Sequence, residues 1–232
     1  MTSSITLSFP SVDLDFPAVL AALRVREGSD DEAELRAMAD EIRAEAQPKA
    51  LYSLAFIAAK GEDYIIADGV RFTSRVLRVN LEDAHRCFPF VCTSGREAEA
   101  WAERQSGFIR RFWADALNQA VLHAAAGQLQ EHLRNRYELG SLSMMNPGSL
   151  ADWPLSEQRS LFSLLGNVPA AIGVELTKSL LMVPTKSVSG IFFPAEESFA
   201  SCQLCPRELC PNRRASYDPE LYDRKYEYER DR

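Results

Sequence analysis

The sequence predicts a single α+β domain, with an antiparallel or mixed twisted sheet flanked by helices. Three observations lead to this prediction. Two long segments carry apolar residues at helical spacing, and several short runs are rich in branched and aromatic residues. Helices and strands do not alternate as they would in a doubly wound parallel sheet, and no GxGxxG phosphate loop is present. A chain of 232 residues is long enough to bury a core without disulfides.

Two segments have the pattern of amphipathic helices. Ser29 and Glu32 stand at capping-box spacing at the start of the first, which runs to Ala46. The second begins at Phe108 and continues to about Tyr137, with charged residues on its other face. The apolar stripe of the first helix consists of Leu35, Met38, Ala39 and Ile42.

The expected strands are short and rich in branched and aromatic residues. They are Leu51–Ala59, Tyr64–Phe72, Arg75–Leu81, Cys87–Thr93, Val174–Val183 and Ser187–Phe193. Asp68-Gly69 predicts a turn within or beside the second run. The stretch Gly140–Ser149 is expected to be loop because it is rich in Gly, Ser and Asn and contains Pro147-Gly148. A short helix is expected over Pro154–Leu165, ended by Gly166.

The composition is that of an ordinary globular protein, with 46% apolar and 25% charged residues. A formal net charge of -7 argues against a general nucleic-acid binder, which needs a basic face. No apolar run is long enough to span a bilayer, and Met1–Val12 lacks the features of a signal peptide. We therefore expect no membrane association and a cytoplasmic location, where the five cysteines stay reduced.

Three of the cysteines, Cys202, Cys205 and Cys210, lie within nine residues and predict a metal site. The metal centre is either zinc or an iron–sulfur cluster. Its fourth ligand comes from Cys87, Cys92, a histidine or an exogenous group. Cys87 and Cys92 are five positions apart, so a strand places them on opposite faces and at most one joins the cluster. Three structural thiols without metal are the remaining alternative.

The C-terminal tail, Tyr217–Arg232, mixes four tyrosines with alternating charge. Two outcomes are open for it. It docks as a short helix through Leu221, Tyr222 and Tyr226, or it stays partly loose. The whole chain, 1–232, is expected to be one domain. We divide it into a helix-and-sheet half (1–140), a motif-bearing half (141–194), and the cysteine loop with the tail (195–232).

Several motifs between Leu142 and Pro194 resemble the activation domain of cobalamin-dependent methionine synthase. They are Met145-Asn-Pro-Gly-Ser149, a helix beginning near Trp153-Pro154, Ile172-Gly-Val-Glu-Leu-Thr-Lys-Ser179, and Lys186-Ser-Val-Ser-Gly-Ile-Phe-Phe-Pro194. In that family the domain binds S-adenosylmethionine and presents its methyl group to oxidised cob(II)alamin. An electron donor then drives reductive methylation. The resemblance implies the fold of that domain and a role in reactivation, while leaving open whether the chain is an enzyme in its own right.

The corrinoid is expected on a partner, either a corrinoid protein or a cobalamin-dependent methyltransferase, because the chain has no Asp-x-His-x-x-Gly signature. The resemblance implies a cofactor site with residues from three places. These are the loop around Pro147-Gly148, the strand expected over Ser187–Phe193, and the segment before the first helix. The site residues are Asn146, Pro147, Gly148, Ser149, Ser189, Gly190, Phe192 and Asp15. Ser187 and Ser189 share one strand face and offer hydroxyls.

Two departures from the family pattern define the alternative function. Ser149 stands where the family has a tyrosine, and Leu142–Asn146 lacks the family's arginine. The alternative is an iron–sulfur or zinc accessory protein of a corrinoid methyltransferase system that has lost S-adenosylmethionine binding. The cysteine cluster is not part of the family pattern and indicates a specialised branch. The electron needed by cob(II)alamin favours a 4Fe–4S cluster, whereas zinc would only fix the loop.

Overall fold

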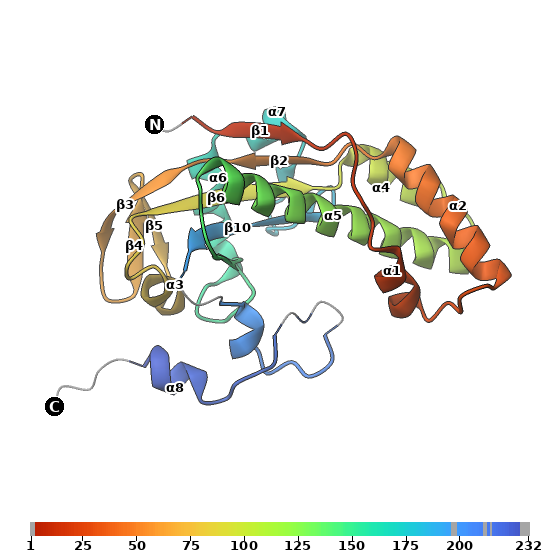
Figure 1. The fold of residues 1–232 in the computed structure, drawn as a ribbon. Coiled ribbons are helices and arrows are strands. Elements are labelled where there is room, and N and C mark those ends of the chain that lie inside the picture. Colours follow the sequence, from red (N-terminus) through yellow and green to blue (C-terminus); the bar gives the residue numbers. More distant parts are fainter. Residues whose placement is uncertain (1–2, 196–198, 211–212, 214, 228–232) are drawn as a thin grey trace.

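A curled antiparallel sheet of eight strands is the frame of the structure (Figure 1). The computed structural model describes residues 3–195, 199–210, 213 and 215–227. β6 (Arg86–Thr93) is the central strand and is buried from Cys87 to Thr93, because it has strands on both edges. β2 (Lys49–Tyr52) and β3 (Ala55–Lys60) share one of its edges, and β10 (Ser187–Pro194) pairs with the other.

The outer strands extend the sheet in both directions from this centre. β1 (Ile5–Ser8) pairs with β2, and β7 (Leu142–Met145) pairs with β10. β3 continues into an arm formed with β4 (Tyr64–Ala67) and β5 (Val70–Thr73). A separate two-stranded ribbon consists of β8 (Glu175–Leu176) and β9 (Met182–Val183).

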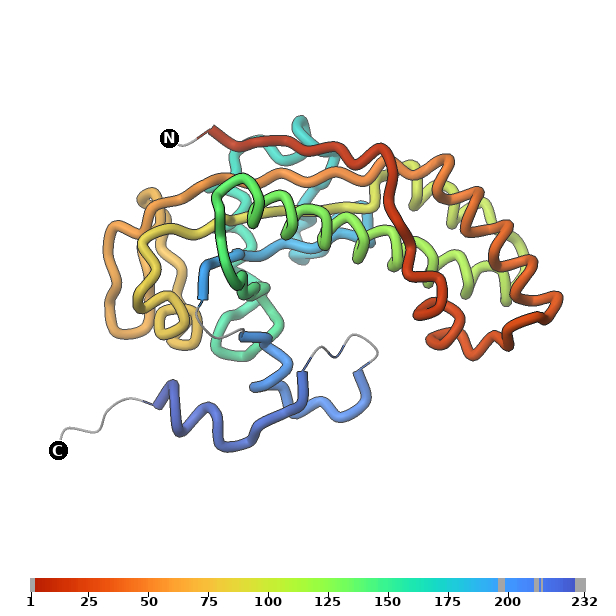
Figure 2. The backbone as a smooth tube through the Cα atoms, viewed as in Figure 1, coloured from red at the N-terminus to blue at the C-terminus, as the bar shows by residue number. Residues whose placement is uncertain are grey.

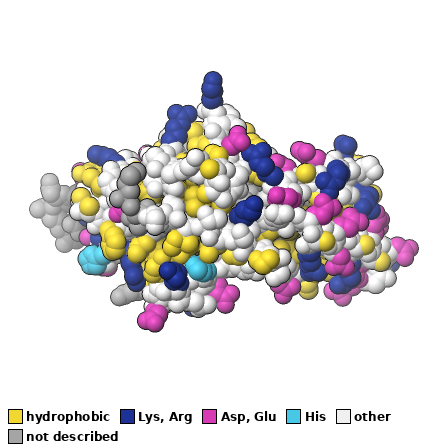
Figure 3. Space-filling view, turned by 90° about the horizontal axis from the view of Figure 1, so that it is seen from above, with side chains coloured by type: hydrophobic (Ala, Val, Ile, Leu, Met, Phe, Trp, Pro, Cys, Tyr) yellow, Lys and Arg dark blue, Asp and Glu magenta, His cyan; other side chains and the backbone are white. Residues whose placement is uncertain are grey.

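One hydrophobic core lies between the sheet and the long helix α5 (Phe108–Arg136), which crosses one face of the sheet (Figure 1). β6 directs Phe88, Phe90 and Cys92 into this core. The helices α1 (Phe16–Leu23), α2 (Asp30–Glu45) and α4 (Arg96–Arg104) pack near the first half of α5. Asp and Glu side chains gather at the end of the molecule formed by α2 (Figure 3).

A second core lies on the opposite face, where β6 contributes Cys87 and Val91. It is covered by α3 (Arg75–Asn80), the short 3₁₀ turn η1 (Leu155–Glu157) with α6 (Gln158–Leu165), and α7 (Val168–Ile172). Among the described residues, no helix is both long and apolar enough to cross a membrane.

The chain after β10 runs beneath the sheet, on the side away from β1 (Figure 2). It contains the 3₁₀ turn η2 (Ser201–Leu204) and the helix α8 (Leu221–Lys225). Of the two outcomes left open for the tail, docking is the observed one up to Glu227. The Tyr226 side chain is fully buried against Phe199, and its hydroxyl donates to Asn80 Oδ1 at 2.9 Å.

The predicted α+β fold, a sheet flanked by helices, is confirmed. Ser29 caps α2 as expected, because its Oγ accepts from the Glu32 N–H at 3.3 Å. The Glu32 carboxylate accepts from the Gly28 N–H rather than from the cap residue itself. The long helix ends at Arg136, and the Asp68-Gly69 turn joins β4 to β5.

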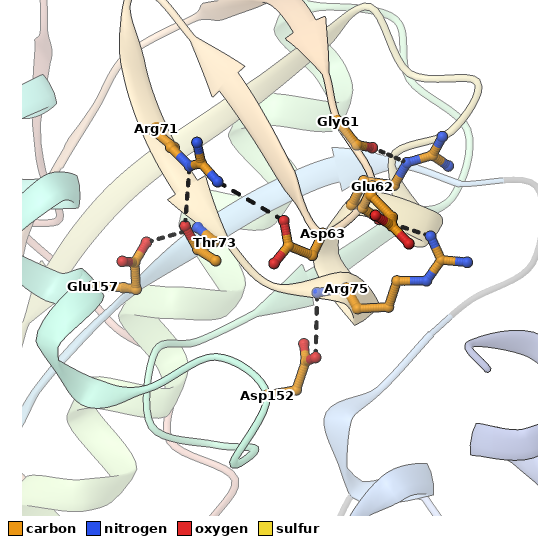
Figure 4. Close-up of polar contacts among 9 residues, drawn as sticks. Gly61, Glu62, Asp63, Arg71, Thr73, Arg75, Asp152 and Glu157 are labelled. Atoms are coloured by element: carbon orange, nitrogen blue, oxygen red, sulfur yellow. Dashed lines mark hydrogen bonds and ion pairs between the residues drawn. The ribbon is translucent and has the colours of Figure 1, made fainter. Parts of the chain in front are cut away.

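The strand predicted over Arg75–Leu81 is wrong, because most of this segment forms α3. Ser74 caps the helix through the Leu77 N–H, and the Asp152 carboxylate accepts from the Ser74 hydroxyl and from the N–H groups of Arg75 and Val76. Figure 4 shows Asp152 reaching the start of this helix. An acceptor from a distant loop at the N-terminal N–H groups favours the helix over a strand.

Three other boundaries also differ from the expectation. Part of the Gly140–Ser149 loop is β7, which gains its hydrogen bonds from β10. Of Val174–Val183, only the two-residue pieces β8 and β9 are extended. The run Leu51–Ala59 divides into β2 and β3 at Ser53-Leu54, because the two strands pair with successive parts of β6.

Candidate functional site

A groove of about 600 Å³ lies between α5 and the strand β10. The lining residues from α5 recur every three or four positions and therefore form one stripe along the helix. Its other side comes from β7, from the residues around the start of β10, and from the segment after β10. The lining residues are Gln119, Leu122, His123, Ala126, Gly127, Gln130, Met144, Asn146, Thr185, Ser187, Val188, Phe192 and Arg213.

The floor of the groove is aromatic and tightly packed. Phe192 lies almost parallel to Phe90, with ring centroids 4.4 Å apart. Gly190 lets the neighbouring strand approach, because a Cβ atom there would stand 2.4 Å from the Met145 carbonyl oxygen and 2.6 Å from Asn146 Nδ2. The Asn146 amide passes over Gly190 and donates to the Ser189 carbonyl oxygen at 2.8 Å. This contact fixes the edge of the groove.

The Asn146-Pro147-Gly148-Ser149 turn begins directly after β7. The Ser149 N–H donates to the Asn146 carbonyl at 3.1 Å, and Gly148 has φ +83°. Proline followed by glycine at positive φ is the signature of a type II turn. The Gly148 N–H donates to the Trp153 carbonyl at 2.7 Å, so the turn is attached to the segment that follows it.

That segment is in turn attached to the β5 arm by two carboxylates (Figure 4). Asp152 accepts from the Arg75 N–H at 3.2 Å, and Glu157 accepts from the Thr73 N–H at 3.1 Å. These bonds hold the middle and the C-terminal end of the segment between β7 and α6 against the end of β5 and the start of α3. The turn beside the groove is therefore supported from the opposite face of the sheet.

The structure brings some of the predicted site residues into the groove and not others. Asn146 and Phe192 line it, whereas Pro147, Gly148 and Ser149 form the turn behind Asn146. Gly190 lies beneath Asn146. The Ser189 hydroxyl accepts from Gln158 Nε2 at 3.2 Å, on the face of the sheet that α6 covers.

Asp15 has a local role in the structure. Its carboxylate accepts from the Ala18 N–H at 3.0 Å and caps α1, and it is exposed. Asp15 is not one of the described residues that line the groove. The role that the resemblance gives it stays a prediction.

Sequence reasoning missed the α5 side of the groove. Gln119, His123, Ala126 and Gln130 recur at helical spacing, but this stripe is polar and resembles a solvated face until β10 is placed opposite it. Gln119 Nε2 and His123 Nε2 are 2.9 Å apart. A mixed lining of aromatic, aliphatic and amide side chains suits a small organic ligand that carries hydrogen-bonding groups.

Residues 18–203 match the family model described as vitamin B12 dependent methionine synthase, activation domain. The chain belongs to this family. The fold is similar to a solved structure described as the MetH reactivation domain bound to AdoHcy, with a TM-score of 0.64 at 19% sequence identity. That similarity covers 86% of this chain and 81% of the other. No curated protein matches the sequence.

The activation-domain match ends within the cysteine segment, so Cys205, Cys210 and Arg213 lie beyond it. The three cysteines of this segment are half-buried. Within the described ranges, no set of three His, Cys, Asp or Glu side chains is placed to hold a metal ion. The metal site predicted from Cys202, Cys205 and Cys210 therefore stays a prediction.

The other two cysteines are buried spectators in the described structure. Cys87 and Cys92 face opposite cores of the sheet, as their spacing predicts. Burial raises the pKa of each thiol to about 12, so both stay protonated at neutral pH. A protonated thiol is a poor nucleophile and a poor metal ligand.

Proposed function

We propose that this chain is a reactivation protein for corrinoid-dependent methyl transfer, which binds S-adenosylmethionine in the groove between α5 and β10. The observation that carries the proposal is the groove itself. Twelve of its thirteen lining residues lie inside the region that matches the activation-domain family, and Arg213 lies beyond it. The similar MetH structure holds AdoHcy, the demethylated product of S-adenosylmethionine, which supports the choice of ligand.

The groove offers suitable partners for this ligand. Leu122, Val188 and Phe192 give apolar surface for an adenine ring, and the amides of Asn146 and Gln130 give hydrogen bonds. Gly127 leaves the α5 side open, because a Cβ atom there would meet no atom within 4 Å. The chain's own residues would thus bind and orient the ligand.

The proposed reaction consumes one electron and one methyl group. An external donor reduces cob(II)alamin, and the reduced cobalt takes the methyl group from the sulfonium, giving methylcobalamin and AdoHcy. We place the corrinoid on a separate partner, a corrinoid protein or a cobalamin-dependent methyltransferase, in the cytoplasm. The activation-domain family supports the cobalamin context.

We further propose Cys202, Cys205 and Cys210 as ligands of a metal centre, either zinc or an iron–sulfur cluster. A 4Fe–4S cluster would provide an electron donor beside the corrinoid, whereas zinc would fix the loop. Anaerobic purification, metal and sulfide analysis and an absorption spectrum decide between them. Iron and sulfide that disappear in Cys205→Ala identify the cluster, and a colourless protein with stoichiometric zinc identifies the structural site. Absence of both metals refutes this part of the proposal.

The test of ligand binding is a calorimetric titration with AdoHcy and S-adenosylmethionine, using a matched pair of variants in the groove. Gly127→Phe fills open space on the α5 side and is expected to weaken binding at least tenfold. Gly127→Ala adds only a methyl group and is expected to bind as the wild type does.

Wild-type protein that binds neither compound would refute the proposal. It would favour the alternative, an iron–sulfur or zinc accessory protein without S-adenosylmethionine binding. The observation behind that alternative is the lack of an arginine in Leu142–Asn146 and Ser149 in place of a tyrosine. For the partner, methylcobalamin formation from cob(II)alamin protein, S-adenosylmethionine and a reductant is the direct assay.

A further inference from the structure

The electrostatic character of the groove comes from a single residue. Among its thirteen described lining residues, Arg213 is the only one with a formal charge at neutral pH when His123 is neutral, and there is no carboxylate. The chain as a whole carries a net charge of -7. An isolated cation in a groove of an acidic protein favours a ligand that brings an anionic group.

Arg213 is held in place by backbone carbonyls of the segment that carries the cysteines. Its Nη1 atom donates to the carbonyls of Cys202 at 3.2 Å and Ala215 at 3.1 Å. Its Nη2 atom donates to the carbonyl of Cys205 at 3.1 Å and to that of Arg207. The guanidinium group thus joins the carbonyls of four described residues of this segment around one positive charge.

These bonds leave part of the guanidinium for a ligand. A guanidinium group has five N–H donors, and four of them are used by the Nη bonds. Within the described part of the chain, the fifth donor, Nε–H, has no acceptor. The carbonyl bonds also fix the side chain before a ligand arrives, so little rotamer entropy is lost on binding.

We propose that Arg213 binds the carboxylate of the amino-acid end of the ligand, so that the cysteine segment forms a wall of the groove. This rests on the proposed function and deepens it, because it names the residue that selects for the carboxylate. Arg213 acts through its charge and its Nε–H. The four carbonyl bonds keep the segment closed while it does so.

The test is a two-by-two comparison of proteins and ligands. The ligands are AdoHcy and S-adenosylthiopropylamine, which keeps the ammonium group but lacks the carboxylate. Wild-type protein is expected to prefer AdoHcy by about tenfold to a hundredfold, the range of a charge-assisted hydrogen bond. Arg213→Ala is expected to lose this preference, and Arg213→Lys to keep part of it.

Two further measurements separate ligand binding from a structural role. Arg207→Ala removes a positive charge from the same segment outside the groove, and it should keep the wild-type preference. Alkylation of Cys205 and Cys210 reports whether the segment is closed, and in the wild-type protein AdoHcy should slow it more than S-adenosylthiopropylamine does.

A preference that survives in Arg213→Ala overturns the proposal, as does wild-type protein that binds both ligands equally. Equal losses for both ligands in Arg213→Ala would make the residue purely structural and would also overturn it. If wild-type protein binds neither ligand, the proposed function fails first, and this inference fails with it. That result is distinct from wild-type protein that binds both ligands equally, which overturns this inference and leaves the proposed function standing.

Discussion

Replacing Gly190 by alanine should loosen the edge of the groove without changing the chemistry of its lining. A Cβ atom at this position would lie 2.4 Å from the Met145 carbonyl oxygen, 2.6 Å from Asn146 Nδ2 and 3.1 Å from Phe90 Cε1. The first of these atoms is backbone, so β7 must move away from β10. The Asn146 side chain must also leave the Ser189 carbonyl, which it now contacts at 2.8 Å.

The magnitude follows from two contributions. Overpacking of a well-filled site costs about 1–3 kcal/mol, and a lost hydrogen bond costs about 1 kcal/mol. We therefore expect Gly190→Ala to lower the free energy of unfolding by about 2–4 kcal/mol. For a domain of this size, that corresponds to a fall in Tm of roughly 5–15 °C.

Urea unfolding followed by circular dichroism measures this, with Gly127→Ala as the matched control. Gly127 lies inside α5, and a Cβ atom there meets nothing within 4 Å. Gly127→Ala should therefore raise stability by about 0.5–1 kcal/mol through helix propensity alone. A loss below about 1 kcal/mol in Gly190→Ala would refute the reasoning, because it would mean that β7 is displaced at little cost.

Three other outcomes follow from single groups in the structure. Burial raises the pKa of Cys87 and Cys92 to about 12. We therefore expect a thiol reagent at pH 8 to modify three of the five cysteines in the native, metal-free protein and all five after unfolding. Fast reaction of four or more cysteines in the native state would contradict this. Asp152→Ala should lower the free energy of unfolding by about 1–3 kcal/mol. Asp152→Asn should lower it by less, because an amide oxygen still accepts from the N–H groups at the start of α3. Equal losses of the two variants in chemical denaturation would argue against the cap. Burial raises the pKa of Tyr226 to about 12 from an ordinary value of 10.0, so its contribution is complete below pH 10 and is lost as the pH rises from 10 through 12. Tyr226→Phe should lose the bond to Asn80, at about 0.5–1.5 kcal/mol near pH 7, and should show a flatter fall in Tm above pH 10; an unchanged alkaline fall would count against this assignment.

The elements predicted well from the sequence are those whose signals are local. Ser29 lies at the start of α2 and caps it as predicted, whereas Glu32 accepts from the N–H of Gly28, one residue before the cap. The Asp68-Gly69 turn and the Pro147-Gly148 turn each need only their own residues to set the backbone. The long stripe of α5 is equally local, because helical spacing repeats along the helix itself.

The elements predicted wrongly depend on partners far along the chain. The start of α3 needs an acceptor from Asp152, which is 77 positions away from Arg75. β7 is a strand because β10 pairs with it, although it lies in a stretch that is rich in Gly, Ser and Asn. Local propensity cannot reveal either contact, since both arise only when the sheet closes.

The residues of the candidate site also divide into those that the sequence predicts and those that depend on distant partners. The turn beside the groove was visible in the sequence, and so was Phe192 on the strand below it. The Ser189 hydroxyl was expected to face a ligand, but α6 covers that face and Gln158 donates to it. Arg213 gave no signal at all, because a basic residue in a short loop has no periodicity and its groove partners come from α5, β7 and β10.

The position of Arg213 makes the cysteine segment and the groove one thermodynamic system. Its guanidinium lines the groove and donates to the carbonyls of Cys202 and Cys205. A ligand that contacts this group therefore changes the free energy of the loop that holds the thiols. If the chain binds both AdoHcy and a metal as proposed, the factor by which AdoHcy changes metal affinity must equal the factor by which the metal changes AdoHcy affinity. If the cysteines bind a metal as proposed, a factor different from one would show that the two sites are coupled, whereas a factor of one would show that Arg213 does not link them.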